Sequence, residues 1–259
     1  MKIKYLFLVV IMLMISGCVQ RYYNTATHAE ETYFYSTDKE IKIGASLSKQ
    51  IEREFKPDND PLIQQRINKI GQQVARETER KELRYHFKVL DVEEINAFAL
   101  PGGYVYIFKG LWEKIEKDDA KIAAVLAHEI AHITARHSIK RLQASYGINI
   151  LSILVAVTPG SDGYSKNKAM AGIGELMLAY SREDEMQADF LATKYMQLAG
   201  YDVAAILDVL QILQDEQRKK PMRTKMVQTH PYISERKKLV KQKINRGSID
   251  FNDYINTIK

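Results

Sequence analysis

The sequence has little of several features that mark other classes of protein. A single cysteine among 259 residues excludes an internal disulfide, so no disulfide framework stabilises the fold. With only 6 prolines and 13 glycines against 46% hydrophobic residues, the chain is neither collagen-like nor of low complexity, and a folded globular body is expected. Lys and Arg outnumber Asp and Glu by 38 to 32, but they form no basic block or arm, so we expect no nucleic-acid partner.

The N-terminus has the layout of a secretory signal. A basic start is followed by an apolar run at residues 5–15, which is too short to span a bilayer as a helix. The run ends in Ile-Ser-Gly directly before the lone Cys18, an arrangement that resembles the lipobox of bacterial lipoproteins. An ordinary signal peptide and an uncleaved hydrophobic anchor are the alternatives.

The lipobox resemblance implies a division of the N-terminal region. Residues 1–17 would be a cleaved signal peptide, Cys18 the lipidated N-terminus and residues 18–37 a tether, because this stretch shows no sustained period. Val19 follows the cysteine where inner-membrane retention would usually show Asp, so an anchor at the periplasmic face of the outer membrane is expected.

Residues 38–259 have the periodicity of a single α+β domain that is mostly α-helical. Alternating apolar residues predict a small sheet with a tight turn at residues 101–103, and one long helix is expected from Asp118 to about Ser145. A basic loop should precede the last helix. The other predicted elements are helices near 41–55, 62–74, 147–157, 169–180, 183–198, 203–217 and from Ser234, and strands at 85–90, 97–100 and 104–108.

The strongest chemical signal is the HExxH motif at residues 128–132, in the middle of the long predicted helix. His128 and His132 are one helical turn apart, so both imidazoles project from one face and can bind a single Zn²⁺. Glu129 lies about 100° round the helix axis, where its carboxylate reaches a metal-bound water without acting as a ligand. The neighbouring residues are apolar or small, which indicates that the histidines are buried.

A catalytic zinc needs a third protein ligand and an open position for water. The metzincin pattern is excluded because Ala135 and Ser138 stand where it requires Gly and His. The better candidate is Glu185 on a second predicted helix, with Asp189 one turn later placed to orient a histidine through its ring N–H. A solvated helix face is the alternative interpretation of this acidic pair.

These residues belong to a wider pattern that resembles the M48 family of zinc metallopeptidases over about residues 38–240. The other matching segments are Glu40-Ile41-x-Ile43-Gly44, residues 96–103 (NAFALPGG), Ser181-Arg182-x-x-Glu185-x-x-Ala188-Asp189, and Thr229-His230-Pro231 followed by Arg236.

The resemblance implies a gluzincin-like fold with a small sheet beside the active-site helix, and one zinc ion per chain. It implies His128, His132 and Glu185 as zinc ligands and Glu129 as the general base. It also implies that the strand containing residues 96–99 (Asn96, Ala97, Phe98 and Ala99) is the edge to which an extended peptide substrate adds. An ordinary hairpin is the alternative for that strand.

Three other residues have open roles. His230 would block the zinc in a latent state, stabilise the transition state in the cleft, or belong to a structural turn. Arg182 and Tyr180 would either stabilise the oxyanion or brace the helix.

The expected function is that of a zinc metalloendopeptidase acting on misfolded or outer-membrane proteins in the periplasm, with the outer-membrane assembly machinery as a candidate partner. The alternative is a membrane-tethered chaperone or assembly factor whose protease activity is latent. A structural zinc site is a weaker interpretation, because such sites have four protein ligands and no spare carboxylate such as Glu129.

Overall fold

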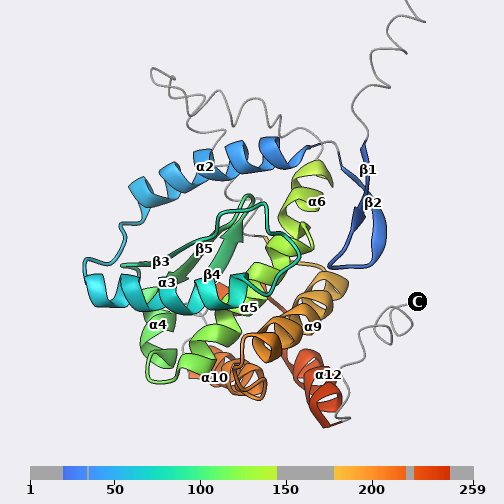
Figure 1. Ribbon diagram of the computed structural model, residues 1–259. Coiled ribbons are helices and arrows are strands. Elements are labelled where there is room, and N and C mark those ends of the chain that lie inside the picture. Colours follow the sequence, from blue (N-terminus) through green and yellow to red (C-terminus); the bar gives the residue numbers. More distant parts are fainter. Residues whose placement is uncertain (1–19, 34, 145–177, 220–224, 246–259) are drawn as a thin grey trace, which may run out of the picture.

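The computed structural model describes residues 20–33, 35–144, 178–219 and 225–245, with a three-stranded sheet among helices (Figure 1). The strands are β3 (His86–Leu90), β4 (Ala97–Leu100) and β5 (Tyr104–Phe108), in the order β3-β5-β4. β3 is parallel to β5, and β4 is antiparallel to β5 with Ala97 opposite Ile107. The predicted strands and hairpin are confirmed.

The hairpin turn contacts the first long helix, α2 (Thr37–Glu54). Gly102 and Gly103 both have positive φ, 78° and 104°. A Cβ atom on Gly102 would lie 2.9 Å from Cα of Ile41, and one on Gly103 would lie 2.4 Å from the carbonyl oxygen of Arg84. Glycine is therefore required here for its conformation and for the close approach of the backbone to its neighbours.

Helices cover both faces of the sheet. α2 packs on one face, while α3 (Pro61–Ala75) and α5 (Asp119–Thr134) pack on the other (Figure 1). Successive side chains of a strand point to opposite faces, so Phe98 and Leu100 of β4 join the α2 side, while Ala97 and Ala99 join the α3 and α5 side. Burial on both faces explains why these strands are apolar at nearly every position.

The prediction of one long helix from Asp118 to about Ser145 is wrong, because the structure has two helices in this region. α5 begins after Asp118, whose carboxylate caps the N–H of Ala120, and a second helix, α6, runs over His137–Ala144. Between them Arg136 adopts a left-handed φ of 56°. Its guanidinium pairs with the buried Glu40 at 3.2 Å, so a tertiary contact overrides the local helical tendency.

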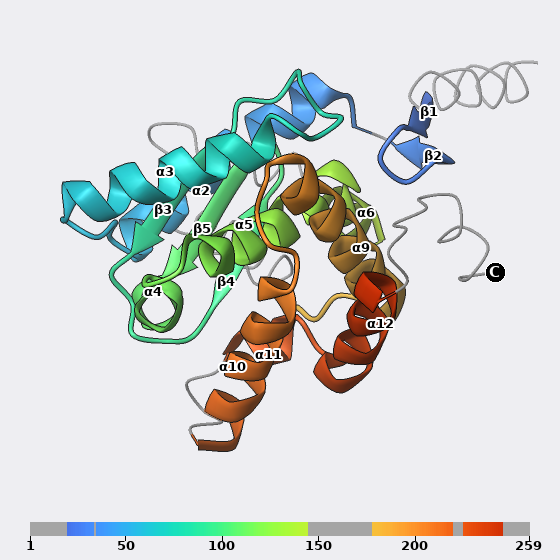
Figure 2. The ribbon, with the colours of Figure 1, turned by 60° about the horizontal axis from the view of Figure 1, so that its bottom comes forward.

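A second group of helices packs beside α5. α9 (Arg182–Leu198) begins at the cap Ser181 and ends before Gly200, as expected, and its fully buried Ala188 and Ala192 face the core. The remaining helices are α4 (Lys109–Ile115), α10 (Ala205–Lys219), α11 (Lys225–Thr229) and α12 (Ile233–Asn245). Figure 2 shows α12 beside α9, and α11 is a short helix within the expected basic loop.

The segment expected to be a tether contains a hairpin. β1 (Gln20–Asn24) pairs antiparallel with β2 (Ala29–Tyr33), and these five-residue strands are too short to show a sustained period in the sequence. The hairpin contacts the body, since Asn24 donates its amide to the carbonyl of Thr134 at 3.3 Å and Lys140 pairs with Glu31 at 2.6 Å.

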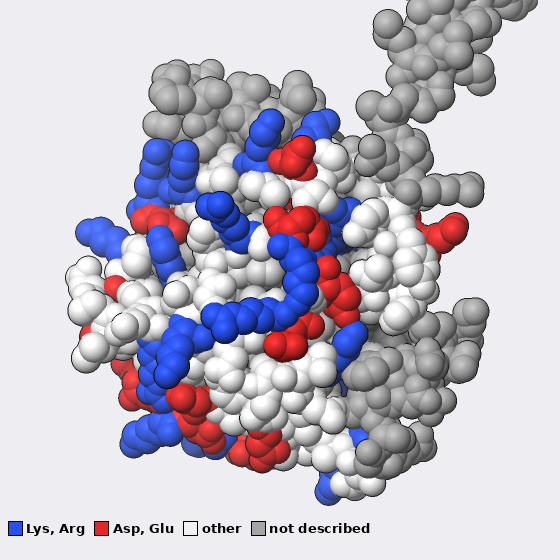
Figure 3. Space-filling view, viewed as in Figure 1, with Lys and Arg blue, Asp and Glu red and all other residues white. Residues whose placement is uncertain are grey.

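Several predictions concern residues outside the described ranges. They are the signal peptide at 1–17, the lipidated Cys18, the apolar helix at 147–157 and most of the helix at 169–180; the described residues 178–180 are not helical. Within the described ranges no helix has the length and apolarity to cross a membrane. On the face shown in Figure 3, Lys and Arg side chains are interspersed with Asp and Glu side chains.

Candidate metal centre

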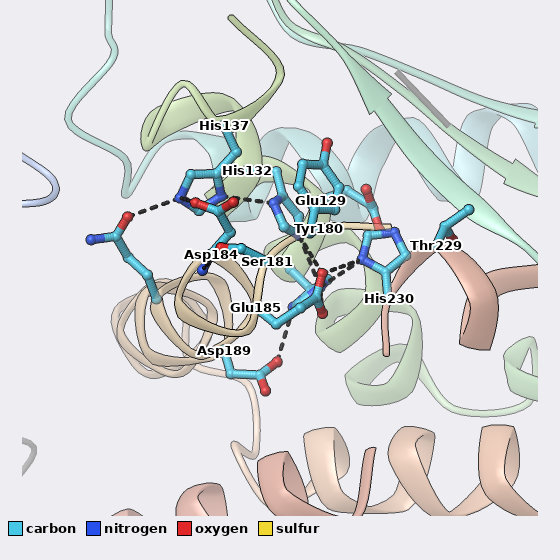
Figure 4. A network of polar contacts seen from close by, with 12 residues as sticks. Glu129, His132, His137, Tyr180, Ser181, Asp184, Glu185, Asp189, Thr229 and His230 are labelled. Carbon is cyan, nitrogen blue, oxygen red and sulfur yellow. Dashed lines mark hydrogen bonds and ion pairs between the residues drawn. The ribbon is translucent and has the colours of Figure 1, made fainter. Parts of the chain in front are cut away.

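The HExxH residues of α5 face the acidic residues of α9 across a buried seam. Nitrogen or oxygen atoms of His128, His132, Glu185 and His230 all lie within 4.8 Å of one another, and all four side chains are buried. The structure therefore brings together the three residues expected to bind zinc and adds His230 from the segment between α11 and α12. Figure 4 shows Glu185 between His132 and His230.

The donor set and its spacing fit zinc. Nε2 of His128 lies 3.1 Å from Nε2 of His132, and these atoms lie 3.4 and 3.5 Å from the two oxygens of Glu185. Donors at the corners of a tetrahedron with bonds of about 2.0–2.1 Å are about 3.3 Å apart. Two imidazoles and one carboxylate also match the ligand set of catalytic zinc in peptidases.

Glu129 lies beside the four residues of this group but contributes no atom to it. It is fully buried, and neither carboxylate oxygen accepts a hydrogen bond among the described residues. Nε2 of His230 lies 3.5 Å from its Oε1. Burial raises the pKa of Glu129, while His230 and His128 act to lower it. A buried carboxylate without a partner is costly unless a bound species uses it, which supports a reacting group at this position.

Asp189 lies where it was expected, behind the first histidine. Its Oδ1 is 2.9 Å from Nδ1 of His128, so Nε2 of that ring is directed at the other ligand atoms. Asp189 in turn accepts two hydrogen bonds of 2.7 Å from Arg236 of α12. The structure thus supports the orienting contact over a solvated helix face for the Glu185 and Asp189 pair, because both residues are buried.

Arg236 joins the carboxylates of the site, a role that the sequence did not reveal. Its Nη1 lies 2.6 Å from Glu185, in addition to its contacts with Asp189. Although burial acts to raise them, Arg236 holds the pKa of Asp189 low and, together with His230, that of Glu185 well below its usual range. Its place in the motif after Thr229-His230-Pro231 was the only available signal.

His230 lies inside the group rather than at its rim. Its Nδ1 is 3.0 Å from Oε1 of Glu185 and 3.2 Å from Nε2 of His128. The preceding Thr229 is close to the amide of Asn96, with 3.5 Å between their side-chain oxygens. The ring therefore lies among the atoms that could hold a metal ion.

The two residues near the start of α9 differ in their placement. Tyr180 stacks on His132 with ring centroids 3.8 Å apart, and its hydroxyl contacts Ser138 at 3.1 Å. Arg182 is half exposed and forms a bidentate ion pair with Glu235 of α12. Its guanidinium therefore braces two helices and lies outside the group of metal-binding atoms.

The strand proposed to bind substrate is an edge of the sheet. Among the described strands β4 pairs only with β5. Side chains at 97–100 are buried in the cores on both faces, and Asn96 is buried as well. The strand runs beside α5, so it lies next to the helix that bears the HExxH residues.

His137 was not identified as a site residue from the sequence. Its Nδ1 lies 2.8 Å from Nδ1 of His132 (Figure 4). Its Nε2 lies 2.8 Å from Oε1 of Gln187. Asp184 is 3.3 Å from the same Nε2. Desolvation lowers the pKa of His132 and of His137.

Comparison with known sequences gives independent information. The profile of peptidase family M48 matches residues 61–244, which is more than half of the chain. The beta-barrel assembly-enhancing protease of Escherichia coli (strain K12) is 28% identical over 204 residues, covering 76% of this chain and 42% of that protein. Mitochondrial metalloendopeptidase OMA1 of Schizosaccharomyces pombe is 29% identical over 136 residues, covering 52% and 40%. Metalloprotease YcaL of Escherichia coli (strain K12) is 25% identical over 164 residues, covering 62% and 63%. The chain spans less than half the length of the first two relatives.

Proposed function

Because this chain belongs to peptidase family M48, we propose that it is a zinc metalloendopeptidase that hydrolyses peptide bonds of other proteins. The observation that carries the proposal is the buried group formed by His128, His132 and Glu185 beside the unpartnered carboxylate of Glu129. A structural zinc site would not need that carboxylate.

The roles of the residues follow from their positions. His128, His132 and Glu185 hold the zinc, and Asp189 orients His128 through its Nδ1–H. A zinc ion held by these residues would supply Lewis acidity for the peptide carbonyl and for the attacking water. Glu129 takes a proton from the attacking water and delivers it to the leaving amine, a transfer favoured by the raised pKa of its buried carboxyl.

The edge strand supplies a way to hold the substrate. An extended peptide that pairs with the edge of β4 left unpaired among the described strands is aligned through main-chain hydrogen bonds, which do not depend on its side chains. β4 runs beside α5, so this alignment leads the peptide past the HExxH residues. Asn96, Ala97, Phe98 and Ala99 are therefore proposed as the substrate-binding strand.

The distances from His230 to Glu185 and His128 fit two roles. As a fourth ligand it would occupy the position needed by water and keep the enzyme latent; as a hydrogen-bond donor it would stabilise the oxyanion of the transition state. Replacing it by alanine separates the two. Latency predicts faster cleavage by His230→Ala, whereas transition-state stabilisation predicts slower cleavage with zinc retained.

We also propose a location and a class of substrate. Residues 1–17 would direct export, Cys18 would carry the lipid, and the domain at 38–259 would act at the periplasmic face of the outer membrane on misfolded or outer-membrane proteins. The name of the Escherichia coli relative, a beta-barrel assembly-enhancing protease, supports this proposal and makes the outer-membrane assembly machinery a candidate partner. A Cys18→Ser variant that still fractionates with membranes would count against the lipid anchor.

The decisive experiment measures zinc content and casein cleavage by the full chain, comparing wild type with Glu129→Gln and Glu185→Ala. We expect one zinc per wild-type chain, loss of cleavage by about 10²–10⁴-fold in Glu129→Gln with zinc retained, and weakened zinc binding in Glu185→Ala. Stoichiometric zinc without any cleavage by wild type or by His230→Ala would instead favour the tethered chaperone. Rescue of a cellular defect by Glu129→Gln would do the same.

A further inference from the structure

The two histidines of the HExxH motif are supported by different partners. Nδ1 of His128 lies against the carboxylate of Asp189, while Nδ1 of His132 lies against the ring of another histidine, His137. Asp189 belongs to the family motif, whereas the motifs identified in the sequence leave His137 without a role.

The directions of the hydrogen bonds follow from the geometry. Nε2 of His132 points toward Glu185 and His128, so zinc binding leaves the ring proton on Nδ1. That proton is directed at Nδ1 of His137, 2.8 Å away, which must therefore accept it. An imidazole that accepts at Nδ1 carries its own proton on Nε2, where Oε1 of Gln187 lies at 2.8 Å.

The chain of contacts ends on the helix that supplies the third ligand. Gln187 and Asp184 both belong to α9, on either side of Glu185, and both approach Nε2 of His137. His137 is almost completely buried and Tyr180 stacks on the face of His132, so neither ring has room to turn. His137 thus connects the ligand His132 to α9.

The break in the predicted long helix makes this contact. In a continuous helix a residue five positions after His132 is turned by about 140° away from it and faces another side. The left-handed Arg136 redirects the chain so that α6 begins at His137, beside His132. Arg136 is held by Glu40 at 3.2 Å and by the hydroxyl of Thr37 at 2.8 Å, both at the start of α2.

We propose that His137 is a positioning residue that fixes the ring orientation and the tautomer of His132, so that Nε2 is presented to the zinc. The inference rests on the proposed function, since it requires a metal at the group. Its place in the mechanism equals that of Asp189 behind His128. The supporting group is an imidazole that contacts an amide, whereas Asp189 is a carboxylate paired with an arginine.

The test compares two substitutions of different chemistry at one position. In His137→Asn the amide oxygen lies two bonds from Cβ, as Nδ1 does in histidine, so it preserves the acceptor. His137→Leu fills a similar volume without one. The measurement is the zinc dissociation constant of the full chain, from competition with a chromophoric chelator. We expect about a 10–100-fold increase for His137→Leu and no more than a few-fold change for His137→Asn.

Variants of Gln187 extend the test without touching the buried ring. Gln187→Glu keeps an oxygen acceptor for Nε2 of His137, so zinc affinity should be retained, whereas Gln187→Leu should weaken it by less than His137→Leu does. These variants keep the inference testable if His137→Leu does not fold.

A spectroscopic measurement addresses the tautomer directly. In long-range ¹H–¹⁵N spectra of the zinc-loaded full chain, we expect Nδ1 of His137 to appear unprotonated and Nε2 protonated. A proton on Nδ1 of His137 would overturn the inference, as would equal zinc affinities for His137→Leu and wild type.

The controls separate failure of this inference from failure of the proposed function. If Glu185→Ala also binds zinc as tightly as wild type, the metal is not held at this group and the proposed function is wrong. If Glu185→Ala loses zinc while folded His137→Leu keeps it, only the role of His137 is refuted.

Discussion

Two regions of this molecule are held together by different forces. The first, here called the sheet core, consists of the apolar side chains that α2 and α3 pack onto the two faces of β3, β4 and β5. The second, here called the charged junction, is where α5, α9 and α12 meet; its members are His128, Glu129, His132, Glu185, Asp189, His230 and Arg236. Both regions are buried, yet the first consists mainly of apolar side chains and the second of charged and polar ones.

This difference shows that one region of the fold provides stability and the other provides the chemical groups. The sheet core is stabilised by the burial of many apolar side chains, and no single pair of them is essential. In the charged junction each ionised group needs its partner, because a buried charge without one is strongly unfavourable. Substitutions in the sheet core should therefore change stability alone, whereas substitutions in the charged junction should change metal binding and activity as well.

The largest effect on stability is expected for Arg236→Met. This change leaves the buried carboxylates of Glu185 and Asp189 without the guanidinium that pairs with both. The free energy of unfolding without zinc should fall by about 3–5 kcal/mol, measured by chemical denaturation. Lys241→Met, at an exposed position of the same helix, is the matched control and should change little. Equal stabilities of the two variants would mean that the junction does not depend on its pairing.

Zinc itself should stabilise only proteins with an intact charged junction. At a free zinc concentration a thousandfold above the dissociation constant, the free energy of unfolding should rise by about 4.1 kcal/mol. Thermal denaturation with zinc and with a chelator should show this increment in wild type and its absence in Glu185→Ala. An equal increment in both proteins would place the metal elsewhere.

Leu47→Ala tests the sheet core. Leu47 is fully buried between α2 and the sheet, so its truncation should lower the free energy of unfolding by about 3 kcal/mol. Leu62→Ala, at a position 71% exposed on α3, is the control and should have little effect. The zinc increment of Leu47→Ala should equal that of wild type; a smaller increment would show that the two regions are coupled.

The smallest effect is expected for Arg182→Ala. The guanidinium of Arg182 pairs with Glu235 at the surface and lies outside the charged junction, so kcat/KM for casein should not change. Glu235→Ala should behave in the same way. A drop of tenfold or more in Arg182→Ala alone would restore the role in oxyanion stabilisation that the sequence left open.

The sheet core could be predicted from the sequence because its pattern is local. Alternating residues at 85–90 and 104–108, together with the turn at 101–103, were sufficient for the strands and the hairpin, and the structure confirms them. The pair His128 and His132 was equally accessible, because its spacing on a helix determines its geometry. Glu185 was a candidate from the acidic pair on the second predicted helix, and the resemblance to family M48, now confirmed by the matching profile, also implied it as a ligand.

The remaining features depend on partners far away in the sequence. The end of α5 is set by Arg136 and Glu40, which are nearly a hundred residues apart, so helical periodicity alone extended the helix too far. The contact between His137 and His132 follows from that break and was missed for the same reason. Arg236 belonged to a matching segment of the sequence, but its role became visible only with α12 packed beside α9.

The order of the metal-binding residues along the chain has a consequence for folding. His128 and His132 are close in any nascent helical turn, but Glu185 is more than fifty residues further on and His230 is further still. Contacts of such long range close large loops and form late in folding. An unfolded chain therefore offers zinc only a two-histidine site of low affinity, and the complete set of ligands exists only after α9 has docked on α5. The proposed proteolytic activity is thus acquired at the end of folding, and a chain that is still folding does not yet have it.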